Sequence, residues 1–235
     1  MIRAVLFDAG NTLIRMDYAA IATEITRHGI VATPETVQRA EWAARVRLDT
    51  ELFAPPGSVS TESRDTGARY TRYVLEGAGV SDPSLIETLT EWRRTYNAPV
   101  GLWTVAEPEA AAALTLVRAC GLKAAVVSNS NGTIRRILES LDLARHLDVV
   151  LDSHEEGLEK PDPRFFDLAL SRLGATAAET AYVGDLYSVD VVGARRAGIH
   201  AVLMDPGSLW GPRDCPAAPT VLDAVRLLLD ARASD

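Results

Sequence analysis

Lysine is scarce in this chain: it occurs only at Lys123 and Lys160, and the other basic residues are arginines. Chemistry that requires an amine therefore has two candidates. Cysteine is equally rare, and a chain of 235 residues buries enough core to need no disulfide framework from Cys120 and Cys215. The first apolar run is only a few residues long and ends at Asp8, which excludes a signal peptide or a membrane span there. We therefore expect a cytoplasmic protein.

Positive charge is also in deficit, since 24 lysine and arginine residues face 32 aspartate and glutamate residues and leave a net charge of −8. This balance argues against a nucleic-acid groove or an anionic membrane surface as the main partner. Hydrophobic residues make up 47% of the chain, which excludes disorder as its main character. The length favours one domain carrying an insertion over two full domains.

Short apolar runs rich in β-branched residues end in polar loops and predict buried parallel strands at 4–7, 124–127, 148–151, 181–183 and 201–204. Between the later runs, helical patterns cover 107–120, 133–141, 163–173 and 189–197. Gly121, Gly174 and Gly198 fit helix C-terminal stops. This alternation predicts an α/β fold with a doubly wound, Rossmann-like parallel sheet, whose ligand site lies at the carboxyl ends of the strands.

Residues 16–98 break the alternation, because their apolar and aromatic positions recur at helical spacing around a loop rich in Pro, Gly and Ser. The chain returns to the sheet pattern near Pro99 and Gly101. We therefore expect a helical domain at 16–98 inserted after the first strand, and an α/β core domain made of residues 1–15 and 99–235.

Chemistry-bearing residues gather in four clusters beside the predicted strands. Residues 7–13 place a carboxylate in a Gly-containing turn whose amide groups suit an anion, and residues 127–132 place small polar donors before a helix. Residues 159–163 hold one of the two lysines between prolines, and residues 184–190 hold two carboxylates five positions apart. Each cluster alone is more typical of a cap or a turn than of a catalytic site.

The order of these clusters is specific: a strand-end Asp, then Ser, then Lys-Pro, then Gly-Asp-x-x-x-x-Asp. This order, with the runs Glu-Lys-Pro-Asp-Pro-Arg-Phe-Phe and Gly-Ala-Arg-Arg-Ala-Gly-Ile, resembles the haloacid dehalogenase-like (HAD) hydrolase superfamily. The resemblance covers roughly residues 1–15 and 99–230. The helical insertion stands where that superfamily has its C1 cap.

The resemblance implies a nucleophile and a metal. Asp8 would attack phosphorus and form an aspartyl-phosphate, which splits one displacement into two easier steps. Mg²⁺ would be held by Asp8, by the carbonyl of Gly10 and by Asp185, with Asp190 placing a metal-bound water or the loop. Converging carboxylates repel one another without a cation, so a hard, oxygen-ligated ion fits this set.

The resemblance also implies a phosphate site and a second catalytic group. Lys160 would neutralise the charge of Asp8 and of the phosphoryl oxygens. The phosphoryl oxygens would be bound by side chains or backbone amides of Gly10, Asn11, Thr12, Ser128 and Asn129. The expected activity is Mg²⁺-dependent hydrolysis of a small phosphorylated metabolite.

One departure from the superfamily pattern concerns proton transfer. Most phosphatases of the superfamily carry a second Asp two residues after the nucleophile, and here that position is Gly10. General acid–base catalysis is worth ~10²–10⁴-fold, so its loss slows alkyl phosphate hydrolysis unless another group substitutes. The insertion offers Asp17, Tyr18 and His28 as substitutes, although each is more typical of a structural residue.

Two branches of the superfamily that lack the second Asp provide alternatives. Phosphonoacetaldehyde hydrolases use a cap lysine, and residues 16–98 contain none. L-2-haloacid dehalogenases, which work without metal, begin with a motif like residues 8–13 but lack an acid equivalent to Asp185. A metal-free halide site has no use for that carboxylate, because it would raise the nucleophile's pKa and repel an anionic substrate. A weakly active protein that mainly binds a phosphorylated ligand is the third possibility.

The insertion also offers possible substrate contacts, namely Trp42, Arg45, Arg47, Arg64, Arg69, Tyr70, Arg72 and Tyr73. Aromatic residues at helical spacing usually form a core and arginines a solvated face, so none is assigned a role. A covered site suits small metabolites. Either a monomer or a homodimer is compatible with the sequence.

Overall fold

The computed structural model describes residues 2–54 and 59–233 and contains a six-stranded parallel sheet. Across the sheet the strands are β5 (Val149–Asp152), β4 (Lys123–Ser128), β1 (Ala4–Phe7), β6 (Thr180–Gly184), β7 (His200–Met204) and β8 (Ala217–Ala218). The order changes direction at β1, the central strand. In parallel α/β sheets the crevice at such a switch point, outside the carboxyl ends of the strands, is where ligands bind.

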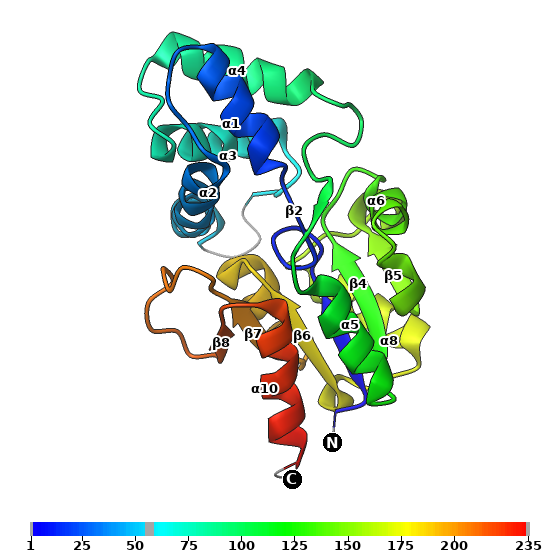
Figure 1. Ribbon diagram of the computed structural model, residues 1–235. Coiled ribbons are helices and arrows are strands. Elements are labelled where there is room, and N and C mark those ends of the chain that lie inside the picture. The colour runs from blue at the N-terminus through cyan, green and yellow to red at the C-terminus, as the bar shows by residue number, and fades with distance from the viewer. Residues whose placement is uncertain (1, 55–58, 234–235) are drawn as a thin grey trace.

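Helices cover both faces of the sheet (Figure 1). One face packs against α5 (Ala110–Ala119), α6 (Ile134–Ser140) and α10 (Val221–Ala233), and the other against α8 (Pro163–Leu173) and α9 (Val192–Arg196). Val5 and Phe7 of β1 join the first cluster, whereas Ala4 and Leu6 join the second. Because side chains alternate across a strand, a continuous apolar run supplies both faces at once.

Local sequence signals set the limits of α8. Asp162 caps its N-terminus by accepting a hydrogen bond from the amide of Arg164, and Pro163 occupies the first helical position. Gly174 ends the helix at φ 60°, a left-handed conformation that costs glycine little. The helix begins and ends as the sequence predicts, and so holds the loop before it, which contains Lys160, against the sheet.

A four-helix region lies above the carboxyl ends of the strands in Figure 1. It contains α1 (Tyr18–Arg27), α2 (Pro34–Leu48), α3 (Arg64–Gly77) and α4 (Pro83–Thr95), and a π-helical turn, η1 (Asp49–Phe53), continues α2. These helices share a hydrophobic cluster of their own. A short antiparallel pair, β2 (Ile14–Arg15) and β3 (Val105–Ala106), joins the segments that enter and leave the region.

The remaining elements are short. They are α7 (Ser153–Glu156), the 3₁₀ turns η2 (Ala144–His146) and η3 (Ala177–Glu179), and the π-helical turn η4 (Tyr187–Val191) that leads into α9. The helix predicted at 189–197 therefore starts as a π turn. Among the described residues, no helix is long and apolar enough to cross a membrane.

The α/β fold class and the five predicted strands are confirmed, each strand to within two residues of its predicted limits. The glycines predicted to stop helices, Gly121, Gly174 and Gly198, all have positive φ values. The division into a core domain and an inserted domain at residues 16 and 98 stays a prediction.

Candidate active site

The turn that follows β1 presents Asp8 at the carboxyl edge of the sheet. Its amide donates a hydrogen bond of 2.8 Å to the carbonyl of Val183 on β6. The chain then folds back on itself, with the amide of Leu13 bonded to the carbonyl of Ala9 at 2.9 Å. Asn11 has a φ of 52°, a conformation that asparagine adopts more readily than most residues. The tight turn leaves the Asp8 carboxylate facing a cavity.

Lys160 reaches Asp8 from the loop before α8. Its ammonium nitrogen lies 2.6 Å from Asp8 Oδ1, 2.8 Å from Asp190 Oδ1 and 2.9 Å from the Tyr182 hydroxyl, so all three of its donors have an acceptor. Burial by itself would lower the pKa of Lys160, but the carboxylates of Asp190 and Asp8 outweigh it and hold the pKa above its ordinary value. The lysine is therefore a fixed cation beside Asp8.

Asp190 fixes both the lysine and the loop after β6. Its Oδ2 atom accepts hydrogen bonds from the amides of Asp185 at 3.0 Å and Leu186 at 2.9 Å. Gly184 makes this packing possible, because a Cβ atom there would lie 2.5 Å from Asp190 Cγ. Both oxygens of Asp190 are thus engaged by protein donors, a pattern typical of a positioning residue.

Three buried carboxylates meet at this edge of the sheet: Asp8, Asp185 and Asp190 each offer an oxygen, and these atoms lie within 4.8 Å of one another. Burial, together with Asp190 and against the effect of Lys160, raises the pKa of Asp8 to about 6. Burial likewise raises the pKa of Asp185 well above its usual range, against the effect of Arg45 and with that of Asp8 and Asp190. The cluster is short of positive charge, which a divalent cation bound by oxygens would supply.

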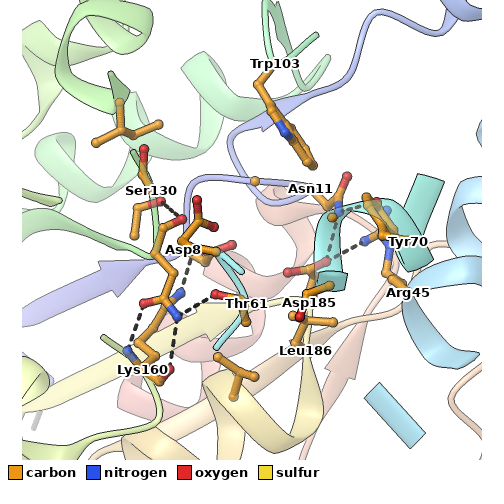
Figure 2. A pocket seen from close by; sticks show the side chains of 18 of the residues that line it. Asp8, Asn11, Arg45, Thr61, Tyr70, Trp103, Ser130, Lys160, Asp185 and Leu186 are labelled. Carbon is orange, nitrogen blue, oxygen red and sulfur yellow. Dashed lines mark hydrogen bonds and ion pairs between the residues drawn. The ribbon is translucent and has the colours of Figure 1, made fainter. Parts of the chain in front are cut away.

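A cavity of about 230 Å³ opens over this cluster (Figure 2). The predicted site residues that line it are Asp8, Gly10, Asn11, Ser128, Asn129, Lys160, Asp185 and Asp190. The structure thus brings together residues drawn from all four sequence clusters. Thr12 is fully buried and does not belong to this lining, so its part in phosphate binding stays a prediction.

Asn129 ties the end of β4 to the lysine loop. Its Oδ1 accepts a hydrogen bond of 2.8 Å from the Lys160 amide, and its Nδ2 donates to the Lys160 carbonyl at 3.0 Å. The same Nδ2 donates to the Thr61 hydroxyl at 2.8 Å, which joins the loop before α3 to the site. Ser128 is buried beside it at the cavity wall. The side chain of Asn129 is therefore engaged in holding the lysine loop and the loop before α3 together.

The four-helix region contributes a buried cation that the sequence did not assign. Arg45 on α2 is fully buried, forms a bidentate pair with Glu41, and has its Nη1 3.4 Å from Asp185 Oδ2. Glu41 also accepts hydrogen bonds from the hydroxyls of Tyr18 at 3.1 Å and Tyr70 at 2.6 Å. Of the eight side chains considered as contacts, Arg45 and Tyr70 line the cavity.

The proton donors suggested by the sequence lie elsewhere. Asp17 caps the N-terminus of α1, Tyr18 donates its hydroxyl to Glu41, and His28 lies 3.7 Å from Glu24. None of the three lines the cavity. Trp103 lies beside the position of the missing second carboxylate, where a Cβ atom on Gly10 would be in ordinary van der Waals contact with the ring at 3.4 Å. Figure 2 shows that ring above the turn.

Comparison with known proteins identifies a family model and several relatives that match this chain. A family model for haloacid dehalogenase-like hydrolases matches residues 2–198. The haloacid dehalogenase-like hydrolase domain-containing protein 3 of Bos taurus is 31% identical over 229 residues, covering 95% of this chain and 87% of that protein. The phosphoserine phosphatase of Thermus thermophilus is 43% identical over 155 residues, or 64% of this chain and 58% of that enzyme.

A solved structure shares the fold. The crystal structure of a HAD phosphatase from Thermococcus onnurineus superposes with a TM-score of 0.61 at 22% identity, covering 97% of this chain and 98% of that one. At this identity the likeness concerns the fold alone. It agrees with the parallel sheet and its flanking helices described above.

Proposed function

Because this chain belongs to the haloacid dehalogenase-like hydrolase family, we propose that it is a Mg²⁺-dependent phosphohydrolase of a small phosphorylated metabolite, working through an aspartyl-phosphate on Asp8. The observation that carries the proposal is the contact of Lys160 with both Asp8 and Asp190 beside a third buried carboxylate, Asp185. The phosphatase named among the relatives supports the same reaction class.

Mg²⁺ fits the residues present. The carboxylates of Asp8 and Asp185 and the carbonyl of Gly10 would hold it, and Asp190 would keep the Asp185 loop in position. The raised pKa values of Asp8 and Asp185 indicate that Lys160 and Arg45 offset only part of the cost of burying these carboxylates, and a hard cation would stabilise their charged forms further. When bound, the ion would neutralise the charge of the phosphoryl group and orient it toward the nucleophile.

Residues of this chain would carry out the transfer of the phosphoryl group to Asp8 and its hydrolysis. An oxygen of Asp8 attacks phosphorus, and the bond from phosphorus to the leaving oxygen breaks. Lys160 is held 2.6 Å from that carboxylate, where its charge stabilises the transferring phosphoryl oxygens as well. Ser128 and the backbone amides near Asn129 and Gly10 would bind the same oxygens. Water then cleaves the aspartyl-phosphate and restores Asp8.

The four-helix region would act as the cap of this enzyme. Its residues Arg45, Tyr70 and Thr61 line the cavity, so that a substrate would be enclosed between the helices and the sheet edge. Enclosure of this kind selects small molecules and excludes water from the reaction. We propose a cytoplasmic enzyme that acts as a monomer or a homodimer.

Metal-free dehalogenation is the less favoured alternative. A dehalogenase nucleophile would need to be ionised without a metal, yet burial and Asp190 raise the pKa of Asp8 to about 6, and the carboxylate of Asp185 lies in the same cluster. The same carboxylate would repel a haloacid substrate. The weakly active binding protein is disfavoured because Asp8, Lys160 and Asp185 are all present, with Lys160 bonded to Asp8 and Asp185 in the same carboxylate cluster.

Turnover of activated phosphates tests the proposal. p-Nitrophenyl phosphate and acetyl phosphate have good leaving groups, so their hydrolysis depends little on an acid. We expect hydrolysis of both with Mg²⁺, none after chelation, and none with Asp8→Asn. Halide release from L-2-chloropropionate without phosphate hydrolysis would instead support the dehalogenase, and inactivity toward all three compounds would support the binding protein.

A further inference from the structure

The cavity contains one carboxyl group that the reaction described above does not use. Among the described residues that line it, the carboxylates are Asp8, Asp185, Asp190 and Glu62, and there is no histidine or cysteine. The only other side chain with an acidic hydroxyl is Tyr70, which already donates to Glu41 and whose pKa is held well above its usual value by burial and by that carboxylate. Glu62 is therefore the one proton donor left over.

Glu62 stands on a loop that is anchored to the rest of the site. The neighbouring Thr61 accepts a hydrogen bond of 2.8 Å from Asn129 at the end of β4. On the other side, Ser60 donates to Glu159 at 2.8 Å, and the Glu62 amide donates to the Ser60 hydroxyl at 3.1 Å. Asn129 follows Ser128 and Glu159 precedes Lys160, so both hydrogen bonds tie the loop to the site. The loop thus holds Glu62 in the cavity lining.

The surroundings of Glu62 favour its protonated form. Although the side chain is open to solvent, the protein around it desolvates it and raises its pKa. Arg93 on α4 lowers that pKa, while Asp152 at the end of β5, Glu159 in the lysine loop and Asp8 raise it. Three of these four charged groups thus raise the pKa of Glu62, as the desolvation does.

The acid is absent from its usual place, because position 10 is glycine. Trp103 lies over Gly10, and a Cβ atom there would be in van der Waals contact with the indole ring at 3.4 Å. Poor leaving groups still require a proton, since an alkoxide is expelled far more slowly than an alcohol. A carboxyl group elsewhere in the cavity lining, as at Glu62, meets this requirement.

We propose that Glu62 is the general acid and base of this enzyme, an inference that rests on the phosphohydrolase function proposed above. In the first step an Asp8 oxygen bonds to phosphorus, the bond from phosphorus to the leaving oxygen breaks, and the Glu62 carboxyl proton passes to that oxygen. In the second step the Glu62 carboxylate takes a proton from the attacking water. The water oxygen bonds to phosphorus as the bond between phosphorus and Asp8 breaks, which releases inorganic phosphate and restores the Asp8 carboxylate and the protonated Glu62.

The leaving-group dependence of kcat/KM tests this role, because kcat/KM reports only the steps up to release of the alcohol. p-Nitrophenyl, phenyl and benzyl phosphate share a ring but differ widely in leaving group. With Glu62→Gln we expect kcat/KM for benzyl phosphate to fall by ~10²–10⁴-fold and that for p-nitrophenyl phosphate to fall by a much smaller factor. The alkaline limb of the wild-type pH profile, where Glu62 loses its proton, should vanish in the variant.

Asp65→Asn is the matched control, since Asp65 lies on the first turn of α3, is exposed and does not line the cavity. Glu62→Asp, which keeps an acid on a shorter side chain, should recover part of the benzyl phosphate activity. An equal loss on all three substrates, or an unchanged pH profile, would overturn the role of Glu62 while leaving the phosphohydrolase intact. Wild-type enzyme that hydrolyses none of the three would overturn both proposals.

Discussion

Arg45 and Glu41 provide the sharpest stability test of the buried network between the helices and the sheet. Arg45 is 2% exposed and Glu41 is 0% exposed, and the pair is bidentate. Removing one partner of a buried ion pair costs ~3–5 kcal/mol, because the other charge is left without compensation. We therefore expect Arg45→Met to lower the free energy of unfolding by about 3 kcal/mol or more.

The effect of Glu41→Gln on the free energy of unfolding should change sign when Arg45 is also replaced. In the wild type, Glu41→Gln should destabilise the protein, since it leaves Arg45 with Asp185 as its remaining carboxylate at 3.4 Å. In the Arg45→Met background the same change should stabilise it, because it removes the unpaired buried charge and keeps an amide oxygen for the hydroxyls of Tyr18 and Tyr70.

Urea unfolding of the four proteins, followed by both tryptophan fluorescence and far-ultraviolet circular dichroism, measures these differences. Coincident transitions by the two signals are needed for a single free energy of unfolding. The account predicts a coupling energy of ~1–3 kcal/mol between the two sites. Additive effects, within about 0.5 kcal/mol, would refute the reasoning, because they would mean that the two side chains do not compensate each other's burial.

The remaining predictions concern pH and packing. Burial raises the pKa of Asp49 to about 6 from 3.8 although Ser188 donates two hydrogen bonds to it, so the folded state binds this proton more tightly than the unfolded state. The stabilisation from protonated Asp49 is fully present below about pH 4. As pH rises through about 6 it is lost, and the free energy of unfolding falls by up to ~3 kcal/mol. Asp49→Asn should flatten the pH dependence of the free energy of unfolding across this window, and an unchanged slope would contradict the assignment. Gly184→Ala should push Asp190 aside and cost ~1–3 kcal/mol together with most of the p-nitrophenyl phosphate activity, whereas full activity at an unchanged melting temperature would show that the contact at 2.5 Å is easily relieved.

The sheet was predictable because its strands are buried on both faces. Runs such as 124–127 are continuous apolar segments that fit few other environments, and the following helices end at glycines. The short pair at residues 14–15 and 105–106 could not be predicted, since two residues a strand carry no periodic signal. The π turn at the start of α9 was missed for a related reason: its residues fit a regular helix equally well.

The gathering of the carboxylates and the lysine at one sheet edge was predictable from the order of the motifs and their resemblance to the family, whereas the groups on the helices and the loop before α3 were not. Asp8, Lys160 and Asp185 each follow a strand or lie in a loop beside one, so the parallel sheet brings them to one edge. Arg45 was considered but left unassigned, because an arginine on a helix is usually solvated and only the packed fold supplies its carboxylate partners. Glu62 lies in a polar loop with no pattern of its own, and only the cavity lining singles it out.

Chemical trapping of the phosphorylated enzyme tests directly whether Asp8 is the nucleophile. Wild-type protein mixed with p-nitrophenyl phosphate and Mg²⁺ would be quenched and reduced with borohydride, which converts an aspartyl-phosphate to homoserine, and then mapped by peptide mass spectrometry. We expect homoserine at position 8 in the substrate-treated sample alone, and none in Asp8→Asn. Turnover without any homoserine, or with homoserine at position 185 or 190, would contradict the assignment of Asp8 as the nucleophile.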